Sequence, residues 1–267
     1  MLNKPRKMPK LLVISVPKSG THLLLQLTMG IPGMEMLQKY NPWCYETDLS
    51  LLRNMKSGQV ALSHFSYSSR YLPLFRRLGI KPIFISRDPR DIAVSLTHFM
   101  MKPSPIFGVK QNYRHHMFKY MHHLPNQEQR LLAIIQGVRP TRPQIVRFGK
   151  CGWPSLTEYT SANYQWLGKP GIHSVTFEEM VRNSQSRTRA VKRIVEYIWG
   201  GGVPLPFSKV VMARRMIQNI KPSQSTTFRN GRIGNWRTEF TPRVKKAFKK
   251  ETGDLLQRLG YEKNARW

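Results

Sequence analysis

The chain has 267 residues, enough for one large domain with a substantial core or for two small domains. Its hydrophobic content of 40% is a little low but typical of a globular chain, with no sign of wholesale disorder, and no apolar run approaches the length of a membrane span. The 44 Lys and Arg residues against 14 Asp and Glu give a formal net charge of +30. Such a charge favours anionic partners such as nucleotides, nucleic acid, acidic glycans or acidic lipid surfaces, although a solvated basic surface is the alternative.

Two cysteines, Cys44 and Cys151, are too few for a disulfide framework, so the sequence favours two free thiols over one bridge. Basic residues precede a short apolar run at residues 11–16, which gives this segment a faint likeness to a signal peptide. The run is too short for the apolar region of such a peptide, and no small-residue cleavage site follows it. We therefore expect a soluble, cytoplasmic protein.

Short apolar runs alternate with helical patterns through the first hundred residues. The continuous runs are typical of strands that are buried on both faces of a parallel sheet. The alternation therefore predicts a parallel α/β sheet. The expected strands are residues 11–16, 60–64 and 83–86, and the expected helices are residues 23–29, 71–78 and 91–101, with Gly79 and Pro89 at helix ends.

Residues 102–152 differ in character, with several prolines, many basic residues and one expected helix at residues 127–136. Long irregular segments in compact domains are usually functional or mobile, so we predict an insertion or lid over the ligand edge of the sheet. Residues 1–267 are expected to form a single domain. After the lid we expect helices at residues 157–167, 187–199, 207–218 and 242–259, a strand at residues 173–177 and a loop at residues 221–236.

Four histidines in the predicted lid raise the question of a metal site. They form two adjacent pairs, His115-His116 and His122-His123. Adjacent histidines point in different directions on a helix, and no companion Cys or Glu lies at ligand spacing. We favour a solvated or acceptor-facing basic lid and predict no metal.

The most informative motif joins the first expected strand to the first expected helix. Pro17 ends the strand because it has no N–H for the sheet, and residues 18–22, Lys-Ser-Gly-Thr-His, follow. Backbone N–H groups at the start of a helix are unpaired and carry partial positive charge, which favours an anion. The glycine allows close approach, the lysine adds a full charge and the hydroxyls add donors. The segment predicts an anion-binding loop, with an ordinary strand-to-helix turn as the alternative.

Arg87 stands where the third expected strand ends, and Ser95 lies in the helix that follows. Ligands of open α/β sheets bind outside the carboxyl ends of the strands, so Arg87 is placed to hold an anion with its planar guanidinium. Ser95 could add a hydroxyl. The alternative is an ion pair between Arg87 and Asp91.

A third segment, residues 229–236, reads Arg-Asn-Gly-Arg-Ile-Gly-Asn-Trp. Two glycines among Arg and Asn make a flexible loop whose backbone donors and guanidinium groups can surround a phosphate. A basic surface turn is the alternative.

Together the three segments resemble the sulfotransferases that use 3′-phosphoadenosine 5′-phosphosulfate (PAPS). Residues 17–21 look like the 5′-phosphosulfate loop of that family, residues 87–99 like its 3′-phosphate strand and helix, and residues 229–241 like its C-terminal cofactor loop. They follow the family's order across nearly the whole chain, which strengthens the joint signal. The resemblance implies a three-layer α/β/α fold with a P-loop-like phosphosulfate loop, PAPS as cofactor, 3′-phosphoadenosine 5′-phosphate (PAP) as product, and no metal.

The resemblance also implies roles for individual residues. His64, after the second expected strand, matches the catalytic histidine that takes a proton from the acceptor, and Glu46 is the fallback base. Lys18 would stabilise the charge that grows on the departing phosphate. The implied cofactor-binding residues are Lys18, Ser19, Gly20, Thr21, His22, Arg87, Ser95, Phe177, Arg229, Asn230 and Gly231.

Three positions depart from the family pattern. Leu23 stands where an aromatic ring commonly stacks on adenine, and Phe177 replaces a tyrosine before Glu178-Glu179-Met180. Leu62 replaces a lysine that commonly precedes the catalytic histidine by two residues. These departures leave the adenine contacts and part of the charge stabilisation open.

Two other functions compete with this interpretation. One is a nucleotide-dependent kinase or NTPase with a degenerate P-loop, which is disfavoured because the lysine precedes Ser-Gly-Thr instead of ending a Gly-Lys-Ser/Thr motif. The other is a non-enzymatic, basic polyanion-binding protein, with aromatic residues among the basic residues 114–147 available for base stacking.

The acceptor is predicted only by class. The high positive charge favours an anionic glycan, glycolipid or metabolite and is compatible with contact to a membrane surface, while small phenols and alcohols stay open. We predict no dedicated nucleic-acid partner. Trp153, Tyr164 and Trp166 could line the acceptor site, and a buried helix face explains Tyr164 and Trp166 equally well. The sequence does not separate a hydroxyl from an amine acceptor, and it leaves the oligomeric state open.

Overall fold

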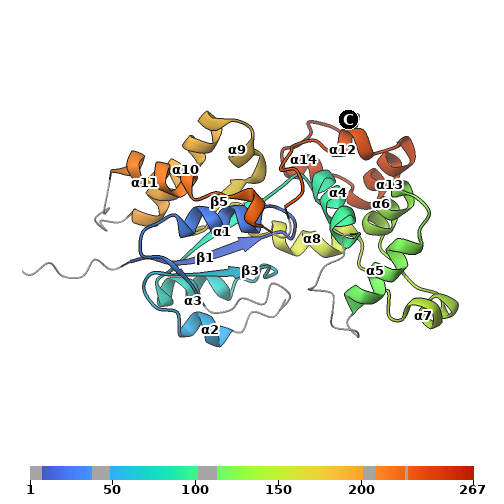
Figure 1. The fold of residues 1–267 in the computed structure, drawn as a ribbon, viewed down its shortest axis with the longest axis horizontal. Helices are drawn as coiled ribbons and strands as arrows, with labels where there is room; N and C mark the ends of the chain where they lie inside the picture. Colours follow the sequence, from blue (N-terminus) through green and yellow to red (C-terminus); the bar gives the residue numbers. More distant parts are fainter. Residues whose placement is uncertain (1–7, 38–48, 102–112, 201–207, 226–227) are drawn as a thin grey trace, which may run out of the picture. The chain divides into compact units, whose positions relative to one another are not determined.

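The computed structural model describes residues 8–37, 49–101, 113–200, 208–225 and 228–267 (Figure 1). The chain forms two compact units. The first unit spans residues 1–87 and 162–231, and the second spans residues 88–161 and 232–267.

A parallel five-stranded sheet forms the centre of the first unit, with the strand order β2-β3-β1-β4-β5. β1 lies between β3 and β4, with Ile14 opposite Ser63 on one side and Phe84 on the other. Because every pair is parallel, the carboxyl ends of β1, β3 and β4 lie at the same edge. The strands are β1 (Lys10–Ser15), β2 (Glu35–Met36), β3 (Gln59–Ser63), β4 (Ile80–Ser86) and β5 (His173–Thr176).

Helices of the first unit cover both faces of this sheet, with α1, α10 and α11 on one face and α3 on the other (Figure 1). This arrangement confirms the predicted three-layer α/β/α architecture. The helices are α1 (Thr21–Met29), α2 (Leu49–Arg53), α3 (Tyr71–Leu78), α9 (Phe177–Val181), α10 (Ser184–Trp199) and α11 (Lys209–Gln218), with a 3₁₀ turn at Pro222–Gln224.

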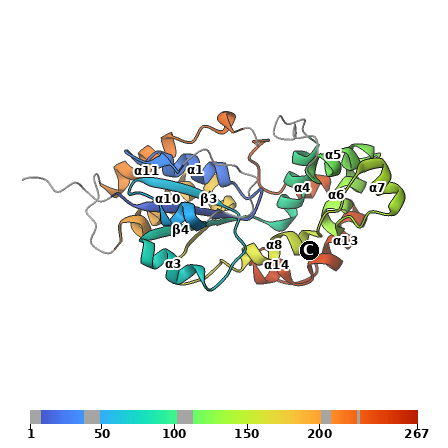
Figure 2. The same cartoon turned by 90° about the horizontal axis from the view of Figure 1, so that it is seen from below.

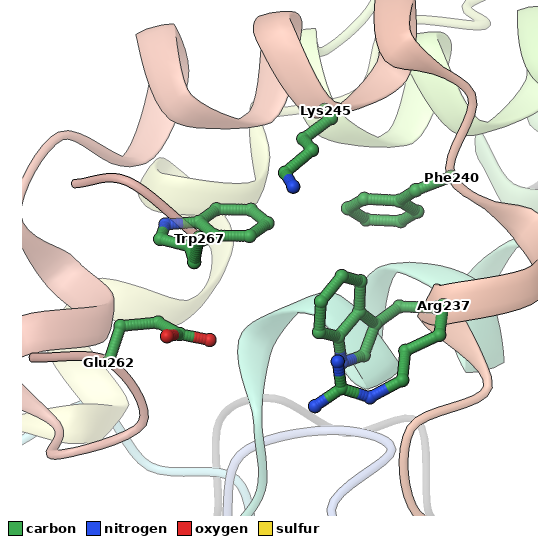
Figure 3. Close-up of a pocket in the computed structure, with 6 residues that line it drawn as sticks. Arg237, Phe240, Lys245, Glu262 and Trp267 are labelled. Atoms are coloured by element: carbon green, nitrogen blue, oxygen red, sulfur yellow. The ribbon is translucent and has the colours of Figure 1, made fainter. Parts of the chain in front are cut away.

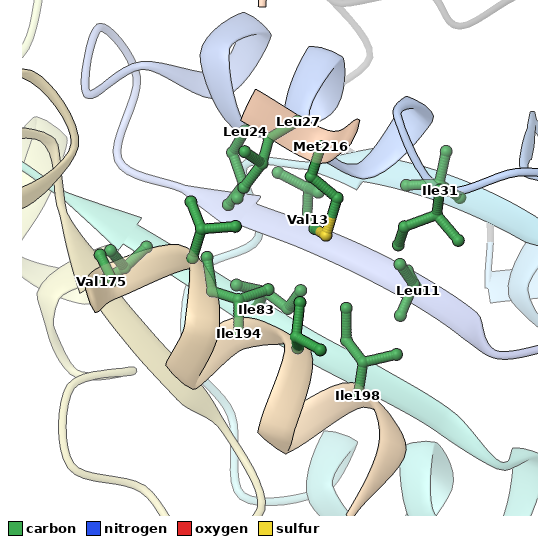
Figure 4. Packing of buried hydrophobic residues seen from close by; sticks show 14 of the residues in the cluster. Leu11, Val13, Leu24, Leu27, Ile31, Ile83, Val175, Ile194, Ile198 and Met216 are labelled. Carbon is green, nitrogen blue, oxygen red and sulfur yellow. The ribbon is translucent and has the colours of Figure 1, made fainter. Parts of the chain in front are cut away.

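The main hydrophobic core lies between the sheet and the helices α1, α10 and α11 (Figure 4). Leu11 and Val13 point into it from β1, since alternate residues of a strand share a face. Ile194 and Ile198 meet them from α10, because residues four apart share a face of a helix. The residues of β1 after Lys10 are all buried, as expected for a central strand covered on both faces.

A stack of aromatic rings packs beside α3. Tyr71 and Phe75 of this helix stack with each other and with Trp166, and Phe65 stacks on Tyr71. The helix has the predicted bounds and ends at Gly79, whose φ of 65° is the left-handed conformation that glycine adopts without a steric cost.

The described part of the second unit is helical (Figure 2). Its helix α6 packs against both α4 and α13. The helices are α4 (Pro89–Met100), α5 (Tyr113–His123), α6 (Gln127–Gln136), α7 (Arg142–Phe148), α12 (Trp236–Glu239), α13 (Pro242–Thr252) and α14 (Leu255–Arg258), while α8 (Leu156–Tyr164) runs from the second unit into the first.

The structure corrects two of the expected elements. The single helix expected at residues 242–259 is two helices, because α13 ends at Gly253, which has a φ of 54°. Residues 102–152 contain α5 and α7 besides the expected α6, so this stretch is less irregular than its composition indicates. Its role as a lid stays a prediction. The short elements β2, α2, α9 and α12 have too few residues to produce a periodic pattern.

Two further expectations concern the cysteines and the membrane. Cys151 is a buried free thiol, and burial raises its pKa, whereas Cys44 lies outside the described residues. None of the helices within the described ranges has the length and apolar character needed to cross a bilayer.

The close approach of α1 to α11 gives a first prediction. A Cβ atom on Gly30 would lie 2.7 Å from the Cα of Met216 and 2.9 Å from the carbonyl oxygen of Arg215. We expect Gly30→Ala to lower the free energy of unfolding by about 1–3 kcal/mol, because two backbones must move apart. Urea denaturation measures the loss. Gly152→Ala is the control, since its nearest neighbour would be 3.6 Å away and about 0.5 kcal/mol or less is expected. Equal losses in the two variants would contradict the packing argument.

Candidate active site

The loop between β1 and α1 has a strained backbone. Among the residues that the structure describes, Lys18 is the one non-glycine residue with positive φ, at 71°. This conformation costs about 1–2 kcal/mol for a residue with a side chain, and such strain is concentrated at functional sites. Gly20 has a φ of 104°, and a Cβ there would lie 2.9 Å from the ring of Phe177. The backbone therefore requires glycine here for both conformation and space.

The hydroxyl groups of this loop lie in a buried environment. Ser19 is fully buried, and its Oγ has no hydrogen-bond partner within the described ranges. Buried polar groups are nearly always hydrogen-bonded, so this hydroxyl fits a site where a ligand supplies the missing partner. Burial and the positive charge of Lys18 lower the pKa of His22, which makes its neutral imidazole the dominant form at neutral pH.

Arg87 lies against the same loop. It follows β4, is 6% exposed, and its Nη1 donates a hydrogen bond of 3.3 Å to the carbonyl oxygen of Lys18. Its guanidinium lies 4.2 Å from the centre of the Phe177 ring, a cation–π distance. Tyr164 donates its hydroxyl to the carbonyl oxygen of Arg87 at 2.5 Å. The first two sequence motifs, which are far apart in the chain, therefore meet in the fold.

His64 follows β3 and is joined to the loop through Ser15. The Nδ1 atom of His64 lies 3.0 Å from the carbonyl oxygen of Ser15 and 3.0 Å from its Oγ. The Oγ of Ser15 in turn lies 2.7 Å from the Oγ1 of Thr21. Asn163 donates to the carbonyl oxygens of His64 and Phe65, both at 2.9 Å, and so holds the backbone that carries the imidazole.

Sequence reasoning missed Ser15 and Asn163. Ser15 is a polar residue at the end of an apolar strand, next to a phosphate-type loop, and that placement was the available signal. Nothing in the local sequence marks Asn163, because its partners lie about a hundred residues earlier. Trp153, Tyr164 and Trp166 are 3%, 6% and 0% exposed, and their contact with an acceptor stays a prediction.

The second unit holds the loop that ends the third motif. Asp91, near the start of α4, is fully buried and accepts hydrogen bonds from the backbone N–H groups of Gly234 at 2.7 Å and Trp236 at 3.1 Å. A carboxylate with two backbone donors fixes the loop to the helix. Ser95 is half-buried on α4. Its binding role, and those of Arg229, Asn230 and Gly231, stay predictions.

A hollow of about 430 Å³ lies within the second unit (Figure 3). Arg90 contacts three of its lining residues: its guanidinium lies 4.0 Å from the ring centre of Trp236 and 4.6 Å from that of Trp267, and it forms ion pairs with Glu262 and with Asp88. The hollow is lined by Trp236, Arg237, Phe240, Lys245, Glu262 and Trp267.

The remaining sequence candidates are placed as follows. Glu46, the fallback base, lies outside the described residues. Leu62 is buried in β3, and Leu23 packs against the hydrophobic core. The four histidines of residues 115–123 lie on α5, and within the described ranges no group of three or more His, Cys, Asp or Glu residues is arranged to hold a metal ion.

Comparison with known proteins decides the family. Residues 8–260 match the family described as Sulfotransferase domain. The chain belongs to this sulfotransferase family. The match covers nearly the whole sequence, both compact units included, and makes the protein an enzyme of sulfuryl transfer. No curated protein matches the sequence significantly.

Solved structures share the sulfotransferase fold. The mouse sulfotransferase SULT7A1, complexed with PAP, is 19% identical, with a TM-score of 0.59 and coverage of 95% of this chain and 88% of that one. Retinol dehydratase is 16% identical, with a TM-score of 0.54 and coverage of 94% and 83% in its complex with androsterone and PAP. A second retinol dehydratase structure, with retinol and PAP, gives the same identity and TM-score, with coverage of 94% and 82%.

The role of Asp91 in the sulfotransferase gives a second prediction. We expect Asp91→Ala to lower the free energy of unfolding by about 2–4 kcal/mol, because it leaves two backbone N–H groups of the loop without their acceptor. Chemical denaturation measures the loss. Asp254→Ala is the control: it removes an exposed carboxylate paired with Arg258, for which about 0.5 kcal/mol is expected. A loss for Asp91→Ala no larger than the control's would show that the loop is held by other contacts.

Proposed function

We propose that this sulfotransferase transfers a sulfuryl group from PAPS to a hydroxyl or amine of an acceptor, with His64 as the general base. The observation that carries the proposal is the contact of Arg87 and Lys18 beside the hydrogen-bonded chain of Thr21, Ser15 and His64. All five residues belong to one sheet edge and its loop. The structural neighbours with PAP support the choice of cofactor.

The β1–α1 loop suits the 5′ end of this cofactor. The buried Ser19 hydroxyl requires an acceptor, Gly20 allows close approach, and Lys18 supplies a full positive charge. When bound, PAPS supplies the activated sulfuryl group. Lys18 would stabilise negative charge on the 5′-phosphate, and a donor of this kind is worth about 3 kcal/mol by analogy with an oxyanion hole. Thr21 and the neutral His22 add donors beside it.

Arg87 suits the 3′-phosphate. Its guanidinium is pre-organised because the carbonyl of Lys18 and the ring of Phe177 hold it from two sides. A planar fork of donors binds a phosphate more specifically than an ammonium does. Ser95, Arg229, Asn230 and Gly231 are assigned to the cofactor by sequence motif alone. Phe177 supports Gly20 and Arg87, in addition to the adenine contact that the resemblance implies.

His64 suits the general base because its backbone and its Nδ1 atom are both held. The carbonyl oxygen of Ser15 can only accept a hydrogen bond, so Nδ1 donates to it and Nε2 is the basic nitrogen of the neutral ring. Nε2 would accept the proton of the acceptor as the new bond to sulfur forms.

The acceptor is proposed by class. The net charge of +30 supports an anionic glycan, glycolipid or metabolite. The neighbours crystallised with androsterone and with retinol support small alcohols as a second class.

One assay tests the reaction and searches for the acceptor together. The purified protein is incubated with ³⁵S-labelled PAPS and cell extracts, and labelled products are separated by class. We expect transfer that does not need added magnesium and that ATP does not replace. Magnesium-dependent ATP turnover without sulfate transfer would support the kinase alternative. Salt-sensitive binding of oligonucleotides without any response to PAPS would support the polyanion-binding alternative.

The third prediction concerns Arg87. We expect Arg87→Ala to raise the dissociation constant of PAP about 100-fold, because a buried charge-assisted contact to a phosphate is worth about 2–3 kcal/mol. Arg87→Lys should recover only part of this, since it keeps the charge and loses the planar fork. Isothermal titration calorimetry measures both. Arg77→Ala removes an exposed charge of α3 and controls for the general electrostatic field. Unchanged PAP affinity in Arg87→Ala would remove Arg87 from the site.

The fourth prediction concerns His64. We expect His64→Ala to lower kcat by about 10²- to 10⁴-fold, the usual contribution of a general base. PAP affinity should stay within about threefold of the wild type, since the imidazole acts on the acceptor and not on the cofactor. Steady-state kinetics and calorimetry measure the two quantities. Wild-type turnover in this variant would move the base elsewhere, with Glu46 as the first candidate.

A further inference from the structure

We propose that Ser15 is a positioning residue, which links the phosphosulfate loop to His64 and fixes the imidazole nitrogen that takes the proton. The inference rests on the proposed function, because it assumes that His64 is the base. Ser15 lies outside the motif of residues 17–22. Its contacts connect the loop proposed to bind the cofactor with the residue proposed to remove the proton from the acceptor.

The geometry places Ser15 between two functional groups. It is the last residue of β1 and is fully buried. Its Oγ lies 2.7 Å from the Oγ1 of Thr21 and 3.0 Å from the Nδ1 of His64. The same Nδ1 lies 3.0 Å from the carbonyl oxygen of Ser15. The two oxygens of one residue therefore lie beside a single nitrogen of the imidazole.

The carbonyl oxygen of Ser15 sets the direction of the bond to His64, and the bond to Thr21 is assigned from it. The carbonyl oxygen can only accept, so Nδ1 carries a hydrogen, which it shares between the two oxygens of Ser15. Because Ser15 Oγ accepts from Nδ1, its own hydrogen is available to Thr21, and we assign the Ser15 hydroxyl as the donor of that pair. The hydroxyl of Thr21 is left to donate to an anion in the loop. The chain thus runs from His64 through Ser15 to Thr21 and the cofactor.

This direction has two consequences for His64. The Nδ1–H tautomer makes Nε2 the basic nitrogen, as the reaction requires. Acceptors on Nδ1 also stabilise the imidazolium ion more than the neutral ring, so they strengthen the base. An anion that accepts from Thr21 polarises the chain in the same direction. The base is therefore oriented more firmly when the loop is filled.

Nearby charges also influence the protonation of His64, so a test must separate their effect from that of Ser15. Lys18 and His22 are the titratable groups of the loop and helix that carry Thr21, and a positive charge on either disfavours the imidazolium form of His64. Asn163, which holds the backbone of His64, is uncharged. A variant that removes only the Ser15 hydroxyl leaves all of these groups in place.

The decisive measurement is the titration of His64 by ¹⁵N NMR of the imidazole, with and without PAP, which does not depend on catalysis. His64→Ala assigns the signals. We expect the wild type to show the Nδ1–H tautomer, and Ser15→Ala to lower the pKa of His64. PAP should raise the pKa less in Ser15→Ala than in the wild type. Ser15→Thr should restore the wild-type titration, and Ser15→Cys should lie between because a thiol is a weaker acceptor.

Kinetics give a second readout. We expect Ser15→Ala to lower the plateau of kcat about tenfold, because the base becomes less well oriented. The acid limb of the pH profile of kcat should also move to lower pH. PAP affinity should stay within about threefold. Thr28→Val is the matched control, because Thr28 is a fully buried hydroxyl of the same unit that donates to Leu25 within its own helix. It should change neither the titration of His64 nor the pH profile.

The outcomes separate this inference from the proposed function. A wild-type titration of His64 in Ser15→Ala would overturn the role of Ser15, even with sulfuryl transfer intact. Loss of turnover with an unchanged titration and pH profile would do the same, since it would indicate a structural effect. The expected coupling without transfer to any acceptor would instead overturn the proposed function.

Discussion

The parallel pairing of β1 with β3 and β4 is the constraint on which the site depends. The apolar residues of β1 must be buried on both faces, which sets its central position and its register with both neighbours. A shift of one residue would turn every side chain to the opposite face. This register places Ser15, His64 and Arg87, which follow or end three different strands, at the same edge of the sheet.

At that edge, packing holds the strained backbone of Lys18 and the buried charge of Arg87 in place. Lys18 occupies a left-handed conformation, and Arg87, almost fully buried, donates to the carbonyl of this same residue. The ring of Phe177 packs beside both Gly20 and the guanidinium of Arg87. The loop is therefore shaped before any ligand binds. A pre-organised set of donors stabilises developing charge better than groups that must first reorient.

The same strand also positions His64, the proposed base. Ser15 ends β1 immediately before the loop, and its two oxygens hold one nitrogen of His64. One short segment of chain thus leads into the β1–α1 loop and orients the imidazole of His64, the proposed base. For this reason, we expect removal of the Ser15 hydroxyl to alter the titration of His64 and not only the stability of the fold.

The sequence by itself determined the family, the parallel α/β sheet and most of the long helices. These features are encoded locally, because apolar runs, helix caps and the Pro-Lys-Ser-Gly-Thr loop each carry their own pattern within about ten residues. The sequence also indicated Lys18, Arg87 and His64 as candidate site residues, because each lies at or just after the end of an expected strand and the carboxyl ends of parallel strands share one edge of the sheet. Only the tertiary structure decided that Arg87 binds the carbonyl of Lys18, that Phe177 supports Gly20, and that Ser15 and Asn163 hold His64. The break at Gly253 and the helices α5 and α7 were likewise missed. Contacts between residues that lie tens of positions apart depend on how the elements pack, and no local pattern of residues records that packing.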